Sequence, residues 1–302
     1  MDSTERLYTA KLSQQKLYLR FFDVDYHPEK GAIPLGNVTF DSVSLKKFDS
    51  YVAVCFITNK TMLKIPSDQV KPLAEKLCQK VFTKAKNMPL VGIQLDCDWS
   101  EKSQSNFFRL CKEVGDICKK KNIELSATIR LHQYRYPEKT GIPPVKRGVL
   151  MLYNMGDING SATENSIFDR KILESYLKEA PPYPIQLEVA LPIFSWAVLK
   201  RMGKTTNILQ QLRFSDMQSN PHLKKLQKNL YSVTKSHYFG GEYLYEGDLL
   251  RWETINKEDL QYIAQTIATC IKVREVIFYH LDTQILNNFS YEELKNLARY
   301  WL

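Results

Sequence analysis

The sequence lacks several features that would assign it to a common protein class. Its longest apolar runs, such as Gly148–Leu152, are far shorter than the roughly 18 residues of a membrane-spanning helix. It contains no Gly-x-Gly-x-x-Gly motif, phosphate loop or Gly-x-Ser-x-Gly elbow, and no His-x-His or His-Glu-x-x-His pair. We therefore predict no membrane span, no serine hydrolase, and no bound cofactor or metal.

Cysteine is sparse and shows no pairing pattern. None of the six cysteines forms a Cys-x-x-Cys motif or stands at zinc-finger spacing, so we predict that all six are reduced core residues. The first residues, Met1–Glu5, lack the charged and apolar regions of a signal peptide. These features predict a cytoplasmic protein; the alternative is a periplasmic or surface-attached protein from which a leader was removed.

Charge of one sign is not concentrated in any segment. Lys and Arg outnumber Asp and Glu by 42 to 33, a net charge of +9, but basic runs such as Lys119–Lys121 fall at predicted helix ends or loops. No element interleaves basic residues with stacking aromatics, which argues against a nucleic-acid partner. Hydrophobic residues at 44% and charged residues at 25% are typical of a globular chain, and no pattern indicates an oligomeric state.

Short runs rich in β-branched and aromatic residues alternate with helical patterns. Seven of these runs are clear predicted strands, and an eighth strand is assigned either to Asn37–Phe40 or to Glu242–Tyr245. Continuous hydrophobicity in most runs is typical of parallel strands that are buried on both faces. The seven clear runs are Leu17–Asp25, Tyr51–Thr58, Val91–Asp98, Leu125–Leu131, Gly148–Tyr153, Ile185–Leu191 and Val276–Tyr279.

Helices are predicted between these strands. Apolar residues recur at helical spacing over Ser67–Lys86, Phe107–Cys118 and Leu260–Ile271, and Ser290–Glu293 is a capping box that begins a last helix. Repeated strand–helix alternation predicts a parallel α/β fold, and the length suits a (β/α)8 TIM barrel better than a doubly wound open sheet. We expect one domain over 1–302, with 200–273 as an insertion before the last strand.

Polar and aromatic side chains follow nearly every predicted strand. In a barrel, the carboxyl ends of the strands carry the chemistry, so these residues are candidates for contacts with a substrate. The candidate substrate-binding residues are Trp99, Trp196, Arg130, His132, Gln133, Asn154, Asp25, Glu188 and Tyr279. The two tryptophans are the preferred stacking platforms, because apolar faces of sugar rings stack on such side chains.

The run Gly92–Asp98 carries the most informative pattern. Side chains alternate along a strand, so Gln94, Asp96 and Asp98 are expected on one face. Two neighbouring carboxylates do not both ionise cheaply in a dry site, so one proton is retained, as a general acid requires. The alternative is that Arg20 and Arg130 neutralise the pair and that its role is structural.

This run resembles the Gly-x-Asp-x-Asp-x-Glu strand of the chitinase-type barrels of glycoside hydrolase family 18. Leu125–Thr128, Met151–Asn154 and Ala190–Phe194 resemble the next strands of that family in order, so the resemblance extends over residues 91–282. A bacterial group of uncharacterised, glycosidase-like barrels with a Gln-Leu/Ile-Asp-x-Asp strand is similar as well.

The resemblance implies roles for three residues. Asp98 corresponds to the proton-donating glutamate, Asp96 to the carboxylate that orients it, and Tyr153 to the tyrosine that steadies the acetamido group of the substrate. In that family the acetamido oxygen acts as the nucleophile, which implies a retaining reaction. Gln94 and Asn154 stand where the family has aspartates.

Three functions follow as hypotheses. The first is a glycoside hydrolase-like barrel that acts on or binds oligosaccharide or polysaccharide. The second is a non-catalytic carbohydrate-binding barrel, because Asp98 replaces a glutamate. The third is a metal-dependent hydrolase centred on Asp23, Asp25 and His280. In the first two, the expected partner is a carbohydrate.

Overall fold

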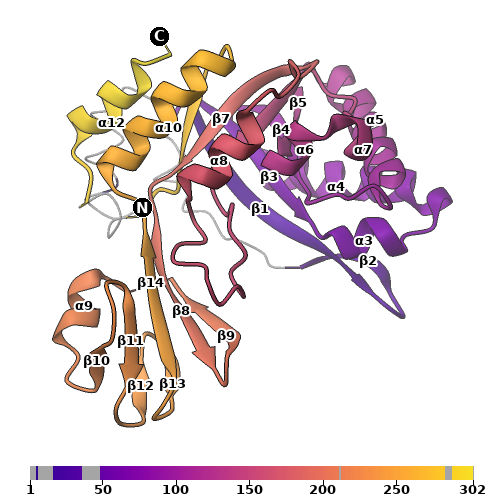
Figure 1. Cartoon of the computed structure of the whole chain (residues 1–302). Coiled ribbons are helices and arrows are strands. Elements are labelled where there is room, and N and C mark those ends of the chain that lie inside the picture. Colours follow the sequence, from indigo (N-terminus) through magenta and orange to yellow (C-terminus); the bar gives the residue numbers. More distant parts are fainter. Residues whose placement is uncertain (1–4, 6–15, 36–47, 211, 283–287, 302) are drawn as a thin grey trace. The chain divides into compact units, whose positions relative to one another are not determined.

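The computed structural model describes residues 5, 16–35, 48–210, 212–282 and 288–301 (Figure 1). These residues form two compact units. The first unit comprises the described residues from 16 to 151 together with 179–189, and the second comprises the remaining described residues. No helix within these ranges is long and apolar enough to cross a membrane.

The largest sheet has eight strands whose order nearly follows the chain (Figure 1). From β1 to β6 the successive neighbours β1, β3, β4, β5 and β6 pair in parallel, whereas β2 pairs antiparallel with β1 at the edge. This mixed α/β arrangement is consistent with the predicted barrel class. In spatial order the strands are β15 (Val276–Tyr279), β7 (Gln186–Pro192), β6 (Arg147–Met151), β5 (Glu124–Ile129), β4 (Leu90–Asp96), β3 (Ser50–Ile57), β1 (Lys16–His27) and β2 (Gly31–Leu35).

All seven clearly predicted strands are present, but one choice for the eighth is wrong. Residues 242–245 overlap β13 (Glu242–Leu244), which pairs with β12 (His237–Phe239) in a separate two-stranded hairpin. The other choice, Asn37–Phe40, lies outside the described residues. The eighth strand of the large sheet is β2, whose Pro34 weakens its strand signal because proline cannot donate to the ladder.

Helices lie between many of the strands along the chain. The four predicted helices are present as α4, α5, α10 and α12. Ser67 does not cap α4 directly, because a short 3-10 turn, η1 (Ser67–Gln69), precedes that helix. Ser290 and Glu293 form the predicted capping box of α12. The helices are α3 (Asn59–Lys64), α4 (Val70–Lys84), α5 (Gln104–Lys120), α6 (Leu131–Arg135), α7 (Pro137–Thr140), α8 (Arg170–Leu177), α9 (Phe214–Ser219), α10 (Lys257–Cys270) and α12 (Tyr291–Ala298).

The first unit buries its core between the parallel strands and the apolar stripes of α4 and α5. Ile93 and Leu95 of β4 and Phe107 of α5 are fully buried. Gly148 permits close packing of β6, because a Cβ atom there would lie only 2.8 Å from the side chain of Ile129. Five cysteines are buried as predicted, but Cys270 is exposed near the end of α10, so its assignment to the core is wrong.

The second unit contains an antiparallel sheet of five strands with its own apolar core. Its inner strands β8 and β14 each bury four successive residues, whereas the edge strands β9 and β10 are largely exposed. Leu199, Leu209, Tyr231 and Leu250 are among the buried members of this core. In spatial order the strands are β10 (Leu223–Lys225), β11 (Leu230–Val233), β14 (Leu249–Thr254), β8 (Ser195–Arg201) and β9 (Lys204–Leu209).

Candidate functional site

The carboxyl end of β4 carries the two aspartates that the sequence singles out. Asp96 is the last residue of the strand, and Asp98 follows two residues later. Its neighbour β5 ends at Ile129, and Arg130 begins the short helix α6 directly after it. Parallel pairing of β4 with β5 therefore brings acidic and basic groups to one edge of the sheet.

Asp96 is the more enclosed member of the pair. Its Oδ1 accepts a hydrogen bond of 2.7 Å from Oγ1 of Thr128, a fully buried residue of β5. Burial raises the pKa of Asp96 from 3.8 to about 6; the charge of Asp98 adds to this rise, while Thr128 and Arg130 oppose it. Asp96 therefore retains a proton in mildly acidic solution.

Asp98 lies at the surface and meets an arginine. Its side chain is 49% exposed, and its Oδ1 lies 3.1 Å from Nε of Arg130. Nη1 of Arg130 also lies 3.5 Å from the sulfur of Met151. The expected arginine contact is thus present for Asp98, but Asp98 is not sealed beneath packed side chains. The pair consists of one accessible carboxylate and one enclosed carboxyl group that binds a proton more readily than an ordinary aspartate.

Gln94 precedes the pair on the same strand and is buried. Its side-chain oxygen has no hydrogen-bond partner within the described part of the chain. Burying an amide oxygen without a hydrogen-bond partner is unfavourable for stability. Gln94 therefore keeps one unsatisfied acceptor two residues before Asp96 in the strand.

Two residues expected to bind substrate near this edge are buried and structural. Trp99 is fully buried, stacks on Phe107 with ring centroids 4.9 Å apart, and donates from Nε1 to the carbonyl of Thr140. Gln133 is also fully buried: it donates to the carbonyl of Trp99 and accepts from the backbone N–H of Arg130. Neither presents a surface to a sugar, so the roles expected for them are wrong.

Glu188 is likewise buried in an internal network. Its carboxylate lies 3.2 Å from Nη1 of Arg147 and accepts a hydrogen bond of 3.1 Å from the hydroxyl of Tyr18. Three strands, β1, β6 and β7, supply these groups. The network accounts for Glu188 as a group that joins strands of the first unit.

Asp25 and His132 remain accessible. Asp25 accepts a hydrogen bond of 2.8 Å from Thr58, which is the main cause of its lowered pKa, and pairs with Lys60 at 3.4 Å. His132 is exposed on α6, and its pKa is lowered first by desolvation of the ring and then by the charge of Arg130. Both stay candidates for substrate contact.

The second unit contains an aromatic cluster around Tyr153 and Tyr279. The two rings are stacked, with centroids 5.1 Å apart and planes only 8° from parallel, and Phe194 meets both edge-on. Tyr153 is buried, whereas Tyr279 at the end of β15 is 42% exposed. Asn154, next to Tyr153, is exposed and has a left-handed backbone conformation with φ of 53°. Tyr279 therefore presents the accessible aromatic surface in this cluster.

Trp196 packs against this cluster and does not present a stacking platform for a sugar. It is buried, packs on Phe194 with ring centroids 5.1 Å apart, and donates from Nε1 to Glu253 at 2.8 Å. Its expected role as a sugar platform is therefore wrong, because its ring has too little exposed surface for stacking.

The sequence did not point to Glu253, although it is the most heavily bonded buried carboxylate described. It accepts hydrogen bonds from Trp196, from both the N–H and hydroxyl of Ser166, and from Nε of Arg251 at 2.6 Å. Asp248, three residues before Arg251 in the chain, pairs with Arg201. The alternation of strand β14 explains the contact of Arg251 with Glu253, since the two residues share one face.

The same sheet holds the long loop that follows Tyr153. Main-chain carbonyls of Ile158 and Gly160 accept hydrogen bonds from the side chain of Arg251, and Gly160 also accepts from Lys200 at 3.0 Å. Thr205 donates to the carbonyl of Ile158 as well. Side chains of β8, β9 and β14 therefore fix the course of this loop within the second unit.

The residues of the metal hypothesis have other partners. Asp23 forms a close ion pair with Arg20 in the first unit, and His280 packs on Phe194 in the second. Within the described ranges, no group of three or more His, Cys, Asp or Glu side chains is arranged to hold a metal ion.

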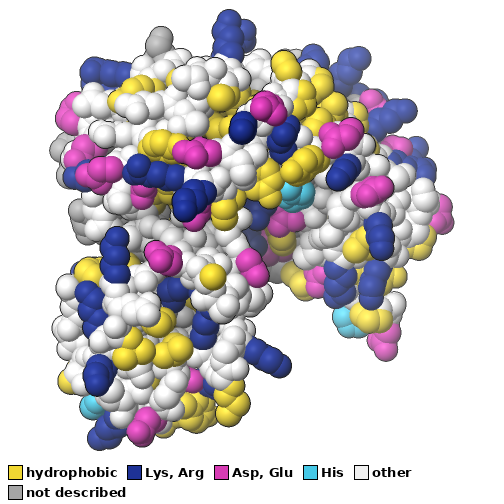
Figure 2. Space-filling view, in the orientation of Figure 1, with side chains coloured by type: hydrophobic (Ala, Val, Ile, Leu, Met, Phe, Trp, Pro, Cys, Tyr) yellow, Lys and Arg dark blue, Asp and Glu magenta, His cyan; other side chains and the backbone are white. Residues whose placement is uncertain are grey.

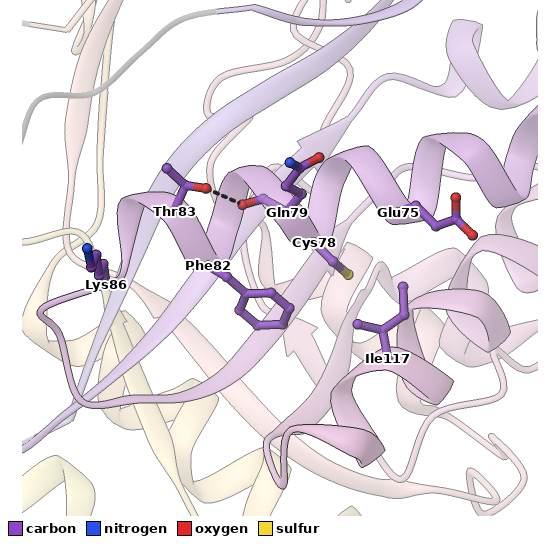
Figure 3. Close-up of a pocket in the computed structure, with 7 residues that line it drawn as sticks. All are labelled: Glu75, Cys78, Gln79, Phe82, Thr83, Lys86 and Ile117. Atoms are coloured by element: carbon purple, nitrogen blue, oxygen red, sulfur yellow. Dashed lines mark hydrogen bonds between the residues drawn. The ribbon is translucent and has the colours of Figure 1, made fainter.

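A shallow hollow of about 530 Å³ lies beside α4 and α5 (Figure 3). Within it, the hydroxyl of Thr83 bonds the carbonyl of Gln79 in its own helix. None of the predicted site residues lines the hollow, so it is separate from the strand ends. Its lining consists of Glu75, Cys78, Gln79, Phe82, Thr83, Lys86 and Ile117.

Solved structures resemble this chain over most of its length, although no protein-family model and no curated protein sequence matches it. A chitinase from Chromobacterium violaceum is 12% identical, with a TM-score of 0.58 over 98% of this chain and 94% of that chain. A class V chitinase from Cycas revoluta, solved with (GlcNAc)3, is 14% identical, with a TM-score of 0.59 over 99% and 95%.

A third similar structure is the spore cortex-lytic enzyme SleL of Bacillus megaterium. It is 12% identical, with a TM-score of 0.58 over 96% of this chain and 71% of that chain. At such low identities these comparisons concern the fold, and they agree with the strand motifs that resemble family 18. The chain therefore has the fold of the chitinase-type barrels of glycoside hydrolase family 18.

Proposed function

We propose that this protein is a chitinase-type glycosidase that acts on polysaccharides of the chitin or peptidoglycan type. The observation that carries the proposal is the acid pair after β4, in which an enclosed Asp96 with a raised pKa precedes an accessible Asp98. The similar structures support the substrate class, because one was solved with (GlcNAc)3 and another is a spore cortex-lytic enzyme.

In the proposed reaction, Asp98 is the catalytic acid. It donates a proton to the glycosidic oxygen as the bond from that oxygen to the anomeric carbon breaks. The acetamido oxygen of the substrate attacks the anomeric carbon, and water then opens the cyclic intermediate with Asp98 as the base. Asp96 orients Asp98 and shares its proton, which its raised pKa favours.

The second unit, considered by itself, holds further aromatic and polar candidates. The stacking of Tyr153 on Tyr279 and the edge contacts of Phe194 fix the ring of Tyr153, which supports the role that the resemblance assigns to it at the acetamido group. Tyr279 is the stacking surface in place of the buried tryptophans, and Asn154 stays a candidate for hydrogen bonds to the sugar. In the first unit, Arg130, Asp25 and His132 are the remaining substrate-binding candidates.

The direct test is Asp98→Asn, with hydrolysis of N-acetylglucosamine oligomers and of peptidoglycan as the assays. We expect a loss of roughly 10²- to 10⁴-fold in rate, the usual effect of removing a general acid. Glu101→Gln is the matched control, because it neutralises an exposed carboxylate three residues along the chain. Full activity of a folded Asp98→Asn variant, checked by circular dichroism, contradicts the assignment of the acid.

The alternative is a barrel that binds the same sugars without cleaving them. The ion pair between Asp98 and Arg130 favours it, because the carboxylate that would serve as the acid is engaged by a side chain of the protein. An aspartate is also one methylene shorter than the glutamate of the family. Binding of (GlcNAc)4 by calorimetry without any turnover selects this alternative.

We also propose that the segment 200–273 is an insertion on a single barrel domain. Its support is that β9, β10, β11 and β14 belong to the five-stranded antiparallel sheet and not to the large sheet. The contacts of this sheet with the loop after Tyr153 give such an insertion a role in positioning that loop.

A further inference from the structure

The hairpin of β12 and β13 exposes three tyrosines. Tyr238, Tyr243 and Tyr245 are 79%, 39% and 51% exposed. In an antiparallel hairpin, the face turned to solvent normally carries polar residues, so three adjacent aromatic side chains there call for a reason. We refer to these three residues as the tyrosine face.

The orientation of the tyrosine face is fixed by the opposite side of the hairpin. Tyr238 stands directly opposite Tyr243 in the pairing register, whereas Leu244 is fully buried and Phe239 packs against the core of the five-stranded sheet. The turn, Gly240-Gly241, has positive φ at both positions, as a two-residue hairpin turn requires. The alternation of the strands thus directs the tyrosines away from the core.

The three rings form one contiguous cluster. Tyr238 and Tyr243 meet edge to face with centroids 4.9 Å apart, and Tyr243 meets Tyr245 in the same way at 5.0 Å. The guanidinium of Arg201 lies 4.3 Å from the centroid of Tyr245 and donates to the carbonyl of Tyr243. Preorganised rings lose little conformational freedom when a ligand covers them.

Two of the charged groups beside the rings already have partners within the protein. Arg201 is held by Asp248 through two hydrogen bonds of 3.0 and 2.8 Å, and Glu242 accepts a hydrogen bond from Asn207. A neutral aromatic face complements an uncharged polymer better than nucleic acid or an acidic membrane, both of which need unpaired basic groups. Figure 2 shows hydrophobic side chains, tyrosine included, gathered near β12 and β13 at the lower end of the five-stranded sheet.

We propose that the tyrosine face binds a neutral, β-linked polysaccharide as an attachment surface that is separate from the strand ends. Tyrosine suits this ligand, because its ring packs on the apolar face of a sugar while its hydroxyl bonds the sugar hydroxyls. The ring spacing of about 5 Å is comparable to the length of one pyranose ring. This inference rests on the proposed function for the choice of polymer.

The test measures how much of the full-length chain is retained on insoluble chitin. The variant is the double substitution Tyr238→Ala and Tyr245→Ala, which removes the two most exposed rings of the face. Tyr300→Ala is the matched control, because Tyr300 is a 44% exposed tyrosine outside the hairpin. We expect retention of the double variant to fall roughly five- to tenfold, and that of the control to equal the original chain.

Parallel measurements separate the outcomes. Equal retention of the double variant and the original chain overturns the inference and leaves the proposed function intact. If the original chain hydrolyses or binds soluble (GlcNAc)4 but is not retained on chitin, the inference alone fails, whereas failure in both assays overturns both proposals. If sedimentation velocity shows that the double variant separates a dimer into monomers, the face joins copies of this chain, and the inference is also wrong.

Discussion

Two enclosed carboxyl groups, one in each unit of the molecule, are held in different ways. In the first unit, Asp96 accepts one hydrogen bond from a side chain, that of Thr128, and its pKa is raised to about 6. In the second unit, Glu253 accepts hydrogen bonds from Ser166, Trp196 and Arg251 and faces a buried guanidinium. One carboxyl group is left with proton-binding capacity, whereas the other has its acceptors occupied.

This difference separates a candidate for chemistry from a structural group. A buried charge with a full set of hydrogen-bond donors fixes the positions of those donors, and its acceptor atoms are all engaged within the protein. A group that folding leaves incompletely compensated is unfavourable for stability and is found preferentially at functional sites. We therefore propose a chemical role for the end of β4 and a supporting role for β14.

The largest expected effect is on Glu253. Glu253→Gln leaves Arg251 buried without its counter-charge, and we expect the free energy of unfolding to fall by about 3–5 kcal/mol. Denaturant unfolding followed by tryptophan fluorescence measures this change. Glu246→Gln is the control, because it neutralises an exposed carboxylate shortly before β14 in the chain. It should change the free energy of unfolding by less than about 0.5 kcal/mol. A similar small loss for Glu253→Gln contradicts a supporting role.

A change of opposite sign is expected at Asp96. Its pKa is higher in the folded chain than the ordinary 3.8, so the folded state binds the proton more tightly, and stability falls as pH rises from about 4 to about 6. Asp96→Asn removes this penalty, and we expect the variant to be more stable than the original chain by about 2–3 kcal/mol above pH 7.

The stability gap between the Asp96→Asn variant and the original chain should close below pH 4, where Asp96 is protonated in both the folded and the unfolded states. Unfolding curves between about pH 3 and pH 8 measure this gap. A variant that is less stable than the original chain at pH 7 contradicts the view that Asp96 is incompletely compensated.

The smallest effect is expected at the ion pair of Asp98 and Arg130. Because the Asp98 side chain is half exposed, solvent screens the pair, and Arg130→Gln should change the free energy of unfolding by less than about 1 kcal/mol. The substitution also removes one of the charges that lower the pKa of Asp96, so that pKa should rise. Carbon-13 NMR titration of the Asp96 carboxyl follows it, and a fall in that pKa contradicts the assignment.

Much of the fold could be predicted from the sequence because its strongest signals are local. Seven strands of the large sheet and the helices α4, α5, α10 and α12 follow from continuous apolar runs and from apolar residues at helical spacing. The five-stranded sheet gave weaker signals, since β10 and β11 have only three and four residues and carry little periodicity. The exposure of Cys270 was also missed, because the last residue of an apolar helix stripe can face either the core or the solvent.

The site was predicted less completely, for a physical reason. Strand alternation placed Asp96 and Asp98 at one strand end, where the structure has them. Exposure depends on packing between distant segments, so Trp99 and Trp196 could not be recognised as buried. Glu253 was missed because its partners Ser166 and Trp196 lie 87 and 57 residues away along the chain.

The loop after Tyr153 has a property that follows from the atoms that anchor it. Arg251, Lys200 and Thr205 bond to carbonyl oxygens of Ile158 and Gly160, which belong to the main chain and are supplied by any amino acid. Substitutions of its other residues can therefore alter its chemistry while its path is preserved, whereas a Cβ atom at Gly160 would lie only 2.4 Å from the hydroxyl of Thr163. Such an arrangement leaves the side chains that follow Asn154 free to vary while these main-chain anchors are retained.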